Sequence, residues 1–204
     1  MTRTFLALAL IATAAPACAQ TPDPWAPTYQ TYIAPASPTT GKLIPKGEVA
    51  ETDVRVICAG KGLYRNVPHP GGTYSQTHRL SQNEAVKKQV MANSGVPFKN
   101  KAHFEDDHFA PLCLGGSDSI NNRWAQPRFG TWNAGVKDHL EAAACEMVCN
   151  GEVDLAVAQN WFNTMVTQDW RVPYCTVFQD PDCAEIYALY PGVAGAVLPH
   201  SPGR

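Results

Sequence analysis

The chain has 204 residues, which is enough for one medium-sized domain with a sizeable hydrophobic core. Sixteen Lys and Arg residues are balanced by eighteen Asp and Glu residues, so the formal net charge is −2 and a generic polyanion binder is disfavoured. Beyond one short N-terminal apolar run, no stretch of the sequence predicts a membrane span.

The N-terminus has the pattern of a secretory signal peptide. Arg3 precedes an apolar run over residues 5–12, and residues 17–19 form an Ala-Cys-Ala cleavage site. We expect cleavage before Gln20, which gives a secreted or periplasmic protein. A lipid-bearing Cys18 is the disfavoured alternative, because the bulky aliphatic residue that usually stands three positions earlier is absent.

The remaining chain divides into three parts. Residues 20–46, after the signal peptide at 1–19, are rich in Pro and Thr and predict a flexible linker. Residues 47–174 hold the motifs and the periodic segments, and form the predicted domain. Residues 175–204 form a C-terminal extension.

Six cysteines remain after removal of the signal peptide. In an oxidising compartment an even set without a C-x-x-C pair predicts disulfides rather than metal ligation. Cys145 and Cys149 lie one helical turn apart, so each is expected to bond elsewhere. Cys175 and Cys183 flank a short turn and could close a local loop, while the sequence leaves the other pairings open. The six are Cys58, Cys113, Cys145, Cys149, Cys175 and Cys183.

Charge is unevenly distributed along the chain. Residues 55–101 hold eight basic residues and one acidic residue, whereas residues 102–185 hold four basic and thirteen acidic residues. This asymmetry suits an enzyme that binds phosphates with one surface and a cation with the other. Two solvated faces of opposite sign explain it equally well.

Residue patterns before position 100 predict two short strands and a helix. The β-branched segments 53–57 and 63–67 predict the strands. A capping box over residues 81–84, with its serine as N-cap, predicts a helix that runs to Asn93 and ends before Gly95.

The patterns after position 100 predict a strand at 104–109, a loop with a Gly-Gly turn and a short return strand. Helical spacing follows over 132–148, and Asp154 is expected to cap a further helix at 155–167. This order lacks the alternation of strands and long helices found in parallel sheets, so it favours the α+β class.

The central motifs resemble the HNH nucleases, and more narrowly the small exported bacterial proteins with an HNH-type region. The matching segments are Val-Ile-Cys-Ala-Gly-Lys-Gly at 56–62, Phe-Glu-Asp-Asp-His-Phe-Ala-Pro-Leu at 104–112, Asn-Arg-Trp-Ala-Gln-Pro at 122–127 and Lys-Asp-His-Leu-Glu at 137–141. The resemblance implies a ββα-metal core, in which one helix crosses a hairpin, with additional helices and disulfides around it.

The resemblance also implies roles for individual residues. His108 would be the general base and Asp107 would hold one divalent cation, with Mg²⁺ or Mn²⁺ preferred over Zn²⁺. Asn122 would fix the loop and orient His108, or ligate the cation. Some relatives carry a histidine where this chain has Gly135, so Asn133 becomes the substitute ligand, although it is also a good helix N-cap.

The implied function is an exported, metal-dependent endonuclease, monomeric and without a membrane span, that acts on DNA in preference to RNA. Four basic residues are candidates for phosphate contacts: Arg55, Lys61, Arg65 and Arg79. Two alternatives are an inactive nucleic-acid or envelope binding module on the same fold, and a disulfide-stapled structural protein.

The individual residues also have purely structural interpretations. Asp107 and His108 could be a surface ion pair. The helix could begin with salt bridges among Lys137, Asp138 and Glu141.

Overall fold

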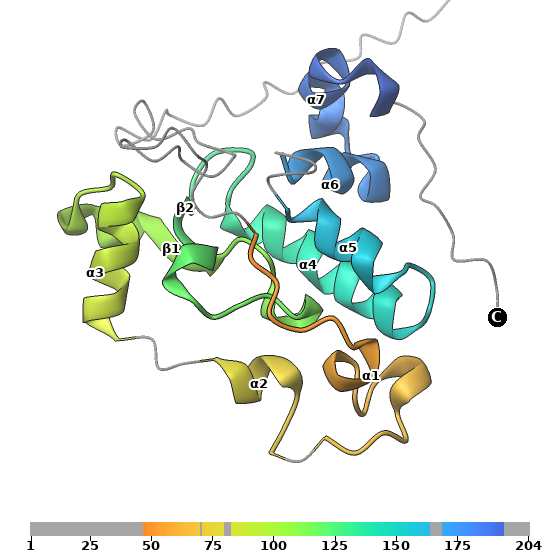
Figure 1. The fold of residues 1–204 in the computed structure, drawn as a ribbon. Coiled ribbons are helices and arrows are strands. Elements are labelled where there is room, and N and C mark those ends of the chain that lie inside the picture. The colour runs from red at the N-terminus through yellow and green to blue at the C-terminus, as the bar shows by residue number, and fades with distance from the viewer. Residues whose placement is uncertain (1–46, 70, 80–82, 164–168, 194–204) are drawn as a thin grey trace, which may run out of the picture.

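The computed structural model describes residues 47–69, 71–79, 83–163 and 169–193, so the predicted signal peptide and linker lie outside the described residues. Seven α-helices and one hairpin are seen within these ranges (Figure 1). They are α1 (Val54–Ile57), α2 (Tyr74–His78), α3 (Glu84–Asn93), β1 (Phe104–His108), β2 (Arg123–Pro127), α4 (Ala134–Cys149), α5 (Leu155–Trp161), α6 (Arg171–Phe178) and α7 (Ala184–Leu189).

The two strands form an antiparallel hairpin, with Asp107 opposite Trp124 and His108 opposite Arg123. The loop between them turns back against β1, and a Cβ at Gly116 would lie only 2.0 Å from the carbonyl oxygen of Ala110. Only glycine fits this close approach. The predicted order of strand, loop, return strand and helix is confirmed, and the fold belongs to the α+β class.

The hairpin lies between α3 and α4 (Figure 1). Met91 of α3 belongs to a small apolar cluster with Phe104 and Ala125, which share one face of the hairpin. The other face carries Asp107 and Trp124, and Trp124 is part of the main core that includes α4. Because side chains alternate along a strand, β1 presents consecutive residues to the two different layers.

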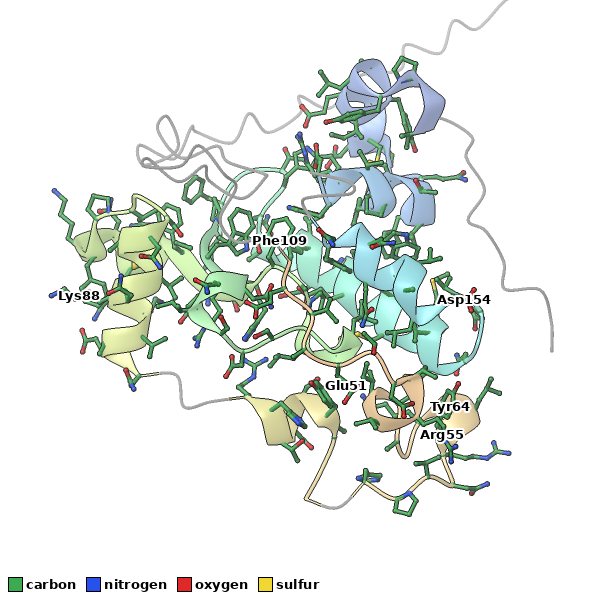
Figure 2. All side chains as sticks on the ribbon, viewed as in Figure 1. Glu51, Arg55, Tyr64, Lys88, Phe109 and Asp154 are labelled. Atoms are coloured by element: carbon green, nitrogen blue, oxygen red, sulfur yellow. A yellow bond between two sulfur atoms is a disulfide. The ribbon has the colours of Figure 1, made fainter. Side chains whose placement is uncertain are left out.

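The main core continues past the hairpin into the C-terminal helices. Leu140 of α4, Phe162 after α5 and Trp170 before α6 are all buried, and Ile186 of α7 belongs to the same cluster. The end predicted for the domain at position 174 lies inside α6. Figure 2 shows the Phe109 side chain in the middle of the molecule, with Lys88 and Asp154 at its periphery.

Three disulfides are present, and all six cysteines of the predicted set take part. Cys58 pairs with Cys149, Cys113 with Cys145, and Cys175 with Cys183. The expectations for Cys145, Cys149 and the local Cys175–Cys183 loop are confirmed. Three disulfides fit an extracellular or periplasmic protein.

The two disulfides at the extremes of loop length should differ in their effect on stability. Cys58 and Cys149 are 91 residues apart, whereas Cys175 and Cys183 are 8 apart. The chain-entropy relation gives losses of about 4.6 kcal/mol and about 2.5 kcal/mol on removal of the longer and the shorter link. Urea unfolding of the two double Cys→Ala variants measures this difference. An equal loss in both variants would show that loop closure does not dominate.

Three local predictions were wrong. Residues 54–57 form a turn of helix rather than a strand, because the Asp53 side chain accepts a hydrogen bond from the Arg55 amide and caps it. Residues 62–64 form a 3₁₀ helix (η2, Gly62–Tyr64), and no strand follows to Val67. Helix α3 is capped by Asn83, whose side chain accepts from the Val86 amide, so the cap is not Ser81, which lies outside the described residues.

The helix predicted for residues 155–167 is shorter, since α5 ends at Trp161 and residues 164–168 lie outside the described part. Asp154 precedes it as expected but makes no side-chain capping hydrogen bond. No described helix has the length and apolar character needed to cross a membrane.

Candidate functional site

His108, the last residue of β1, carries a buried imidazole at the start of the hairpin loop. Its side chain is 5% exposed, and its Nε2 atom hydrogen-bonds to the carboxylate of Asp118 in that loop. Burial lowers the pKa of His108, and the hydrogen bond with Asp118 offsets part of this effect. The lowered pKa favours the neutral imidazole, which is able to accept a proton.

Arg123 stands opposite His108 in the hairpin and connects two carboxylates. Its Nε and Nη2 atoms donate to Asp106 over 3.0 and 2.6 Å, and its Nη1 atom lies 3.8 Å from Asp118. These side chains are almost entirely buried, so each charge needs the partner that it has. The result is a buried chain of alternating charges that ends at the imidazole.

The ammonium group of Lys137 links β1 to α4. Its side chain is fully buried, and Nζ donates to Asp107 Oδ2 and to the His108 carbonyl oxygen, each over 2.7 Å, and to the carboxylate of Glu141. An ammonium has three N–H donors, so all of them are used. Burial opposes the charge, but the Asp107 and Glu141 carboxylates outweigh it and raise the pKa of Lys137.

A cavity of about 140 Å³ lies along β1, between that strand, α2 and α4. Four consecutive residues of β1 line it, so the cavity follows the length of the strand rather than one face. Its charged lining is mostly acidic and comprises Glu105, Asp106, Asp107, Asp138, Glu141 and Arg79. Burial, reinforced by neighbouring carboxylates, raises the pKa of Glu105, Asp138 and Glu141, as expected where negative charge accumulates.

Three of these carboxylates are close enough to share a cation. Asp107, Asp138 and Glu141 each offer an oxygen atom, and these oxygens lie within 4.8 Å of one another. Lys137 takes one oxygen of Asp107 and one of Glu141, which leaves the second oxygen of each carboxylate for another partner. Such hard oxygen donors suit Mg²⁺ or Mn²⁺ better than a softer ion.

Asn122 holds the loop rather than reaching the acidic cavity. Its side chain accepts from the Ala110 amide over 3.0 Å and donates to the carbonyl oxygens of Ala110 and Ser117 over 2.9 and 2.7 Å. The residue is fully buried, so its amide is saturated by the backbone on both sides of the loop. Of the two roles expected for Asn122, this geometry favours the first and not ligation.

Asn133 caps α4. Its side chain accepts from the Val136 amide over 3.3 Å and donates to the Gly130 carbonyl oxygen over 2.9 Å. It does not line the acidic cavity, and Gly135 lies beside it at the helix start. The arrangement fits the helix-cap interpretation of Asn133, and Asp138 and Glu141 farther along α4 are the residues that offer oxygens within 4.8 Å of Asp107.

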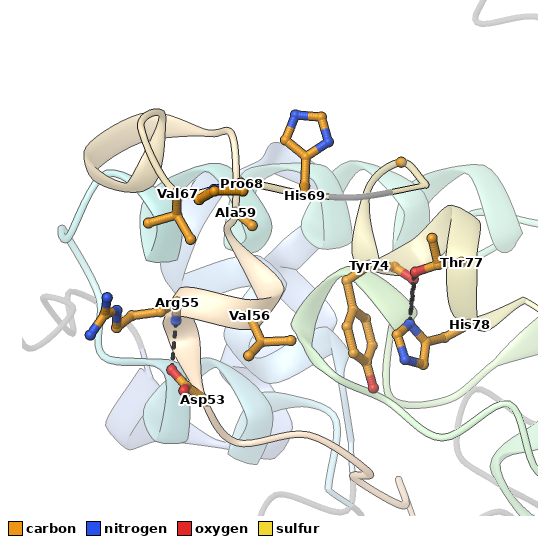
Figure 3. A pocket seen from close by; sticks show the side chains of 11 residues that line it. Asp53, Arg55, Val56, Ala59, Val67, Pro68, His69, Tyr74, Thr77 and His78 are labelled. Carbon is orange, nitrogen blue, oxygen red and sulfur yellow. Dashed lines mark hydrogen bonds between the residues drawn. The ribbon is translucent and has the colours of Figure 1, made fainter.

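The four basic candidates are not gathered in one place. Arg79, which follows α2, lines the acidic cavity, and Arg65 follows the 3₁₀ helix η2. Lys61 lines a separate cavity beside α4. Arg55 belongs to a third cavity of about 430 Å³, where its side chain points away from Tyr74 (Figure 3). Only Arg79 therefore lies with His108 and Asp107.

Sequence reasoning did not assign a role at the site to Asp118, Asp138, Glu141 or Lys137. The Lys137–Glu141 pair at helical spacing was anticipated as a salt bridge and is confirmed, yet it also reaches across to Asp107. Asp118 lies ten residues after His108 in an irregular loop, where spacing carries no directional information. The Lys-Asp-x-x-Glu run on α4 was the available signal for the other three.

Comparisons of this chain with protein-family models, with curated proteins and with solved structures found no match.

Proposed function

We propose that this protein is an exported, metal-dependent endonuclease that hydrolyses phosphodiester bonds, with DNA as the preferred substrate, on a ββα-metal core of the HNH type. One observation carries the proposal. A buried histidine on β1 and three carboxylates from β1 and α4 line the same small cavity. A base next to a cation site is the minimum that metal-assisted hydrolysis requires.

His108 would accept the proton of a water molecule as its oxygen attacks phosphorus. The bond from phosphorus to the leaving oxygen breaks, and this oxygen takes a proton from solvent. Water and one diester thus give one phosphate monoester and one free hydroxyl group. The guanidinium of Arg79, in the lining of the cavity, is available to contact a phosphate oxygen through its planar donor groups.

Asp107, Asp138 and Glu141 would hold one divalent cation, since their oxygens satisfy the donor preference and the proximity it needs. When bound, the cation supplies charge neutralisation on the phosphate and on the leaving oxygen. This set replaces the pair of Asp107 and Asn133 expected from the sequence. Burial raises the pKa of Asp138 and of Glu141, repulsion from Asp107 raises it further, and the cation would relieve that repulsion.

Cleavage of supercoiled plasmid DNA tests this proposal. The protein that begins at Gln20 is incubated with millimolar Mg²⁺ or Mn²⁺, or with EDTA. We expect nicked and linear products with the metal and none with EDTA. The Asp107→Asn variant should lose metal-dependent cleavage, whereas Asp154→Asn, an exposed change at the start of α5, should cleave as wild type does. No cleavage by the wild-type protein would overturn the enzymatic function.

Metal binding can be measured apart from activity. A ligand that binds only the folded state stabilises it by about 2.7 kcal/mol at 100 times its Kd. Mn²⁺ should therefore raise the Tm of the wild-type protein, and the Asp107→Asn and Glu141→Gln variants should lose this shift.

One observation favours the inactive binding module as a second candidate. The helix start holds Gly135 and a capping Asn133, and Lys137 already neutralises part of the acidic cluster. Gel-shift measurements with the same plasmid distinguish the two functions. Binding without cleavage would support the module, and neither binding nor cleavage would support a structural protein.

A further inference from the structure

A buried chain of ionisable side chains around His108 determines which ring nitrogen of the imidazole is free to accept a proton. His108, Asp118, Arg123 and Asp106 are joined in sequence, and their side chains are only 5, 6, 2 and 6% exposed. Burying four ionisable groups in a small domain is costly in solvation free energy, and apolar residues of similar size would pack there without that cost. Such a chain therefore points to a role in orientation.

The hydrogen bond of the imidazole determines its tautomer. An ionised carboxylate can only accept a hydrogen bond, so the proton between His108 Nε2 and Asp118 belongs to the ring nitrogen. In the neutral ring the lone pair then resides on Nδ1. Within the described part of the chain Nδ1 has no hydrogen-bonding partner, and His108 lines the acidic cavity.

Arg123 keeps the carboxylate of Asp118 in place. Its guanidinium is fixed by two hydrogen bonds to Asp106 and approaches Asp118 with its remaining nitrogen. Asp118 is thus held from one side by Arg123 and itself holds His108 from the other.

We propose that Asp118 is a positioning residue that fixes His108 as the Nε2–H tautomer and thereby makes Nδ1 the atom that accepts the proton. This inference rests on the proposed hydrolase function for its catalytic meaning, but the tautomer is a property of the folded protein alone. It adds a third member, from the hairpin loop, to the Asp107 and His108 pair that the sequence indicates.

The tautomer is tested by nitrogen NMR on protein labelled with ¹⁵N-histidine, at pH 8 and with EDTA. The His108 signals are assigned from their loss in the His108→Gln variant. In the wild type, Nε2 should carry the proton and Nδ1 should not. In Asp118→Asn the amide group can donate to Nε2, so the population should move to the Nδ1–H form. An unchanged tautomer in Asp118→Asn would overturn the inference.

Cleavage kinetics provide the second readout. Asp118→Asn should lower kcat by about 10²–10⁴-fold, the range of a general base held in the wrong form, with little change in KM. Asp154→Asn is the matched control, and circular dichroism confirms that both variants are folded. A kcat equal to that of wild type would overturn the positioning role. A tautomer shift in a protein that cleaves nothing would support the positioning of His108 and overturn the proposed function.

Discussion

Replacing His108 with alanine is expected to lower kcat for plasmid cleavage by about 10²–10⁴-fold, because no other described side chain offers a neutral base in the acidic cavity. The affinity for DNA should change little, since the imidazole is buried and uncharged. Initial rates at saturating plasmid, together with gel-shift titrations, separate these two quantities.

His69→Ala is the matched control for this experiment. His69 is exposed and lines the cavity between α1 and α2, so its removal should leave the rate unchanged (Figure 3). Cleavage that persists in His108→Ala and disappears in His69→Ala would place the catalytic centre at the cavity between α1 and α2, and would contradict the assignment to His108.

Replacing Lys137 with methionine is expected to reduce the free energy of unfolding by about 3–5 kcal/mol, the usual loss when one member of a buried ion pair is removed. The methionine nearly matches the lysine in volume, so the loss comes from the two carboxyl groups: Asp107 is left without its counter-ion, and Glu141, whose pKa burial raises to about 8, is left buried without its hydrogen-bond donor. The His108 carbonyl oxygen loses a donor as well. Urea unfolding at pH 7, followed by circular dichroism, measures the change.

The loss in Lys137→Met should diminish as the pH falls. Burial raises the pKa of Glu141 to about 8, and removal of Lys137 raises it further, so the loss should be larger at pH 9 than at pH 7, because a protonated carboxyl group needs no counter-ion. Lys101→Met is the control, because Lys101 and Glu84 form an ion pair on the surface, with side chains 48 and 71% exposed. A loss as large in Lys101→Met as in Lys137→Met would contradict the structural role of the buried pair.

Much of the central fold could be predicted from residue patterns. The predicted strand ending at His108 is present, with a buried residue at each end and three half-buried acidic residues between them, and α4 shows the apolar spacing that places Leu140 and Ala144 in the core. The segment at 53–57 was misjudged because its Val and Ile residues favour strands, whereas the Asp53 cap imposes a helical turn.

The candidate site was only half predictable for a related reason. Asp107 and His108 are neighbours in sequence, so their motif is visible. Asp118, Asp138 and Glu141 approach them only after the loop has folded back and α4 has packed on the hairpin. Asn133 was expected as a metal ligand, but asparagine is also a common helix N-cap. In the structure its side chain caps α4.

Four residues along one side of α4 fix this helix to the rest of the domain. Lys137, Glu141, Cys145 and Cys149 follow one another at intervals of four, and each is tied to another residue: the first two to each other and Lys137 also to β1, the last two by disulfides to Cys113 and Cys58. Ion pairs therefore fix the N-terminal half of α4, and disulfides fix its C-terminal half. One residue inserted midway along α4 would turn the two ends by about 100° relative to each other, so the two disulfides and the contact of Lys137 with Asp107 could not both be kept.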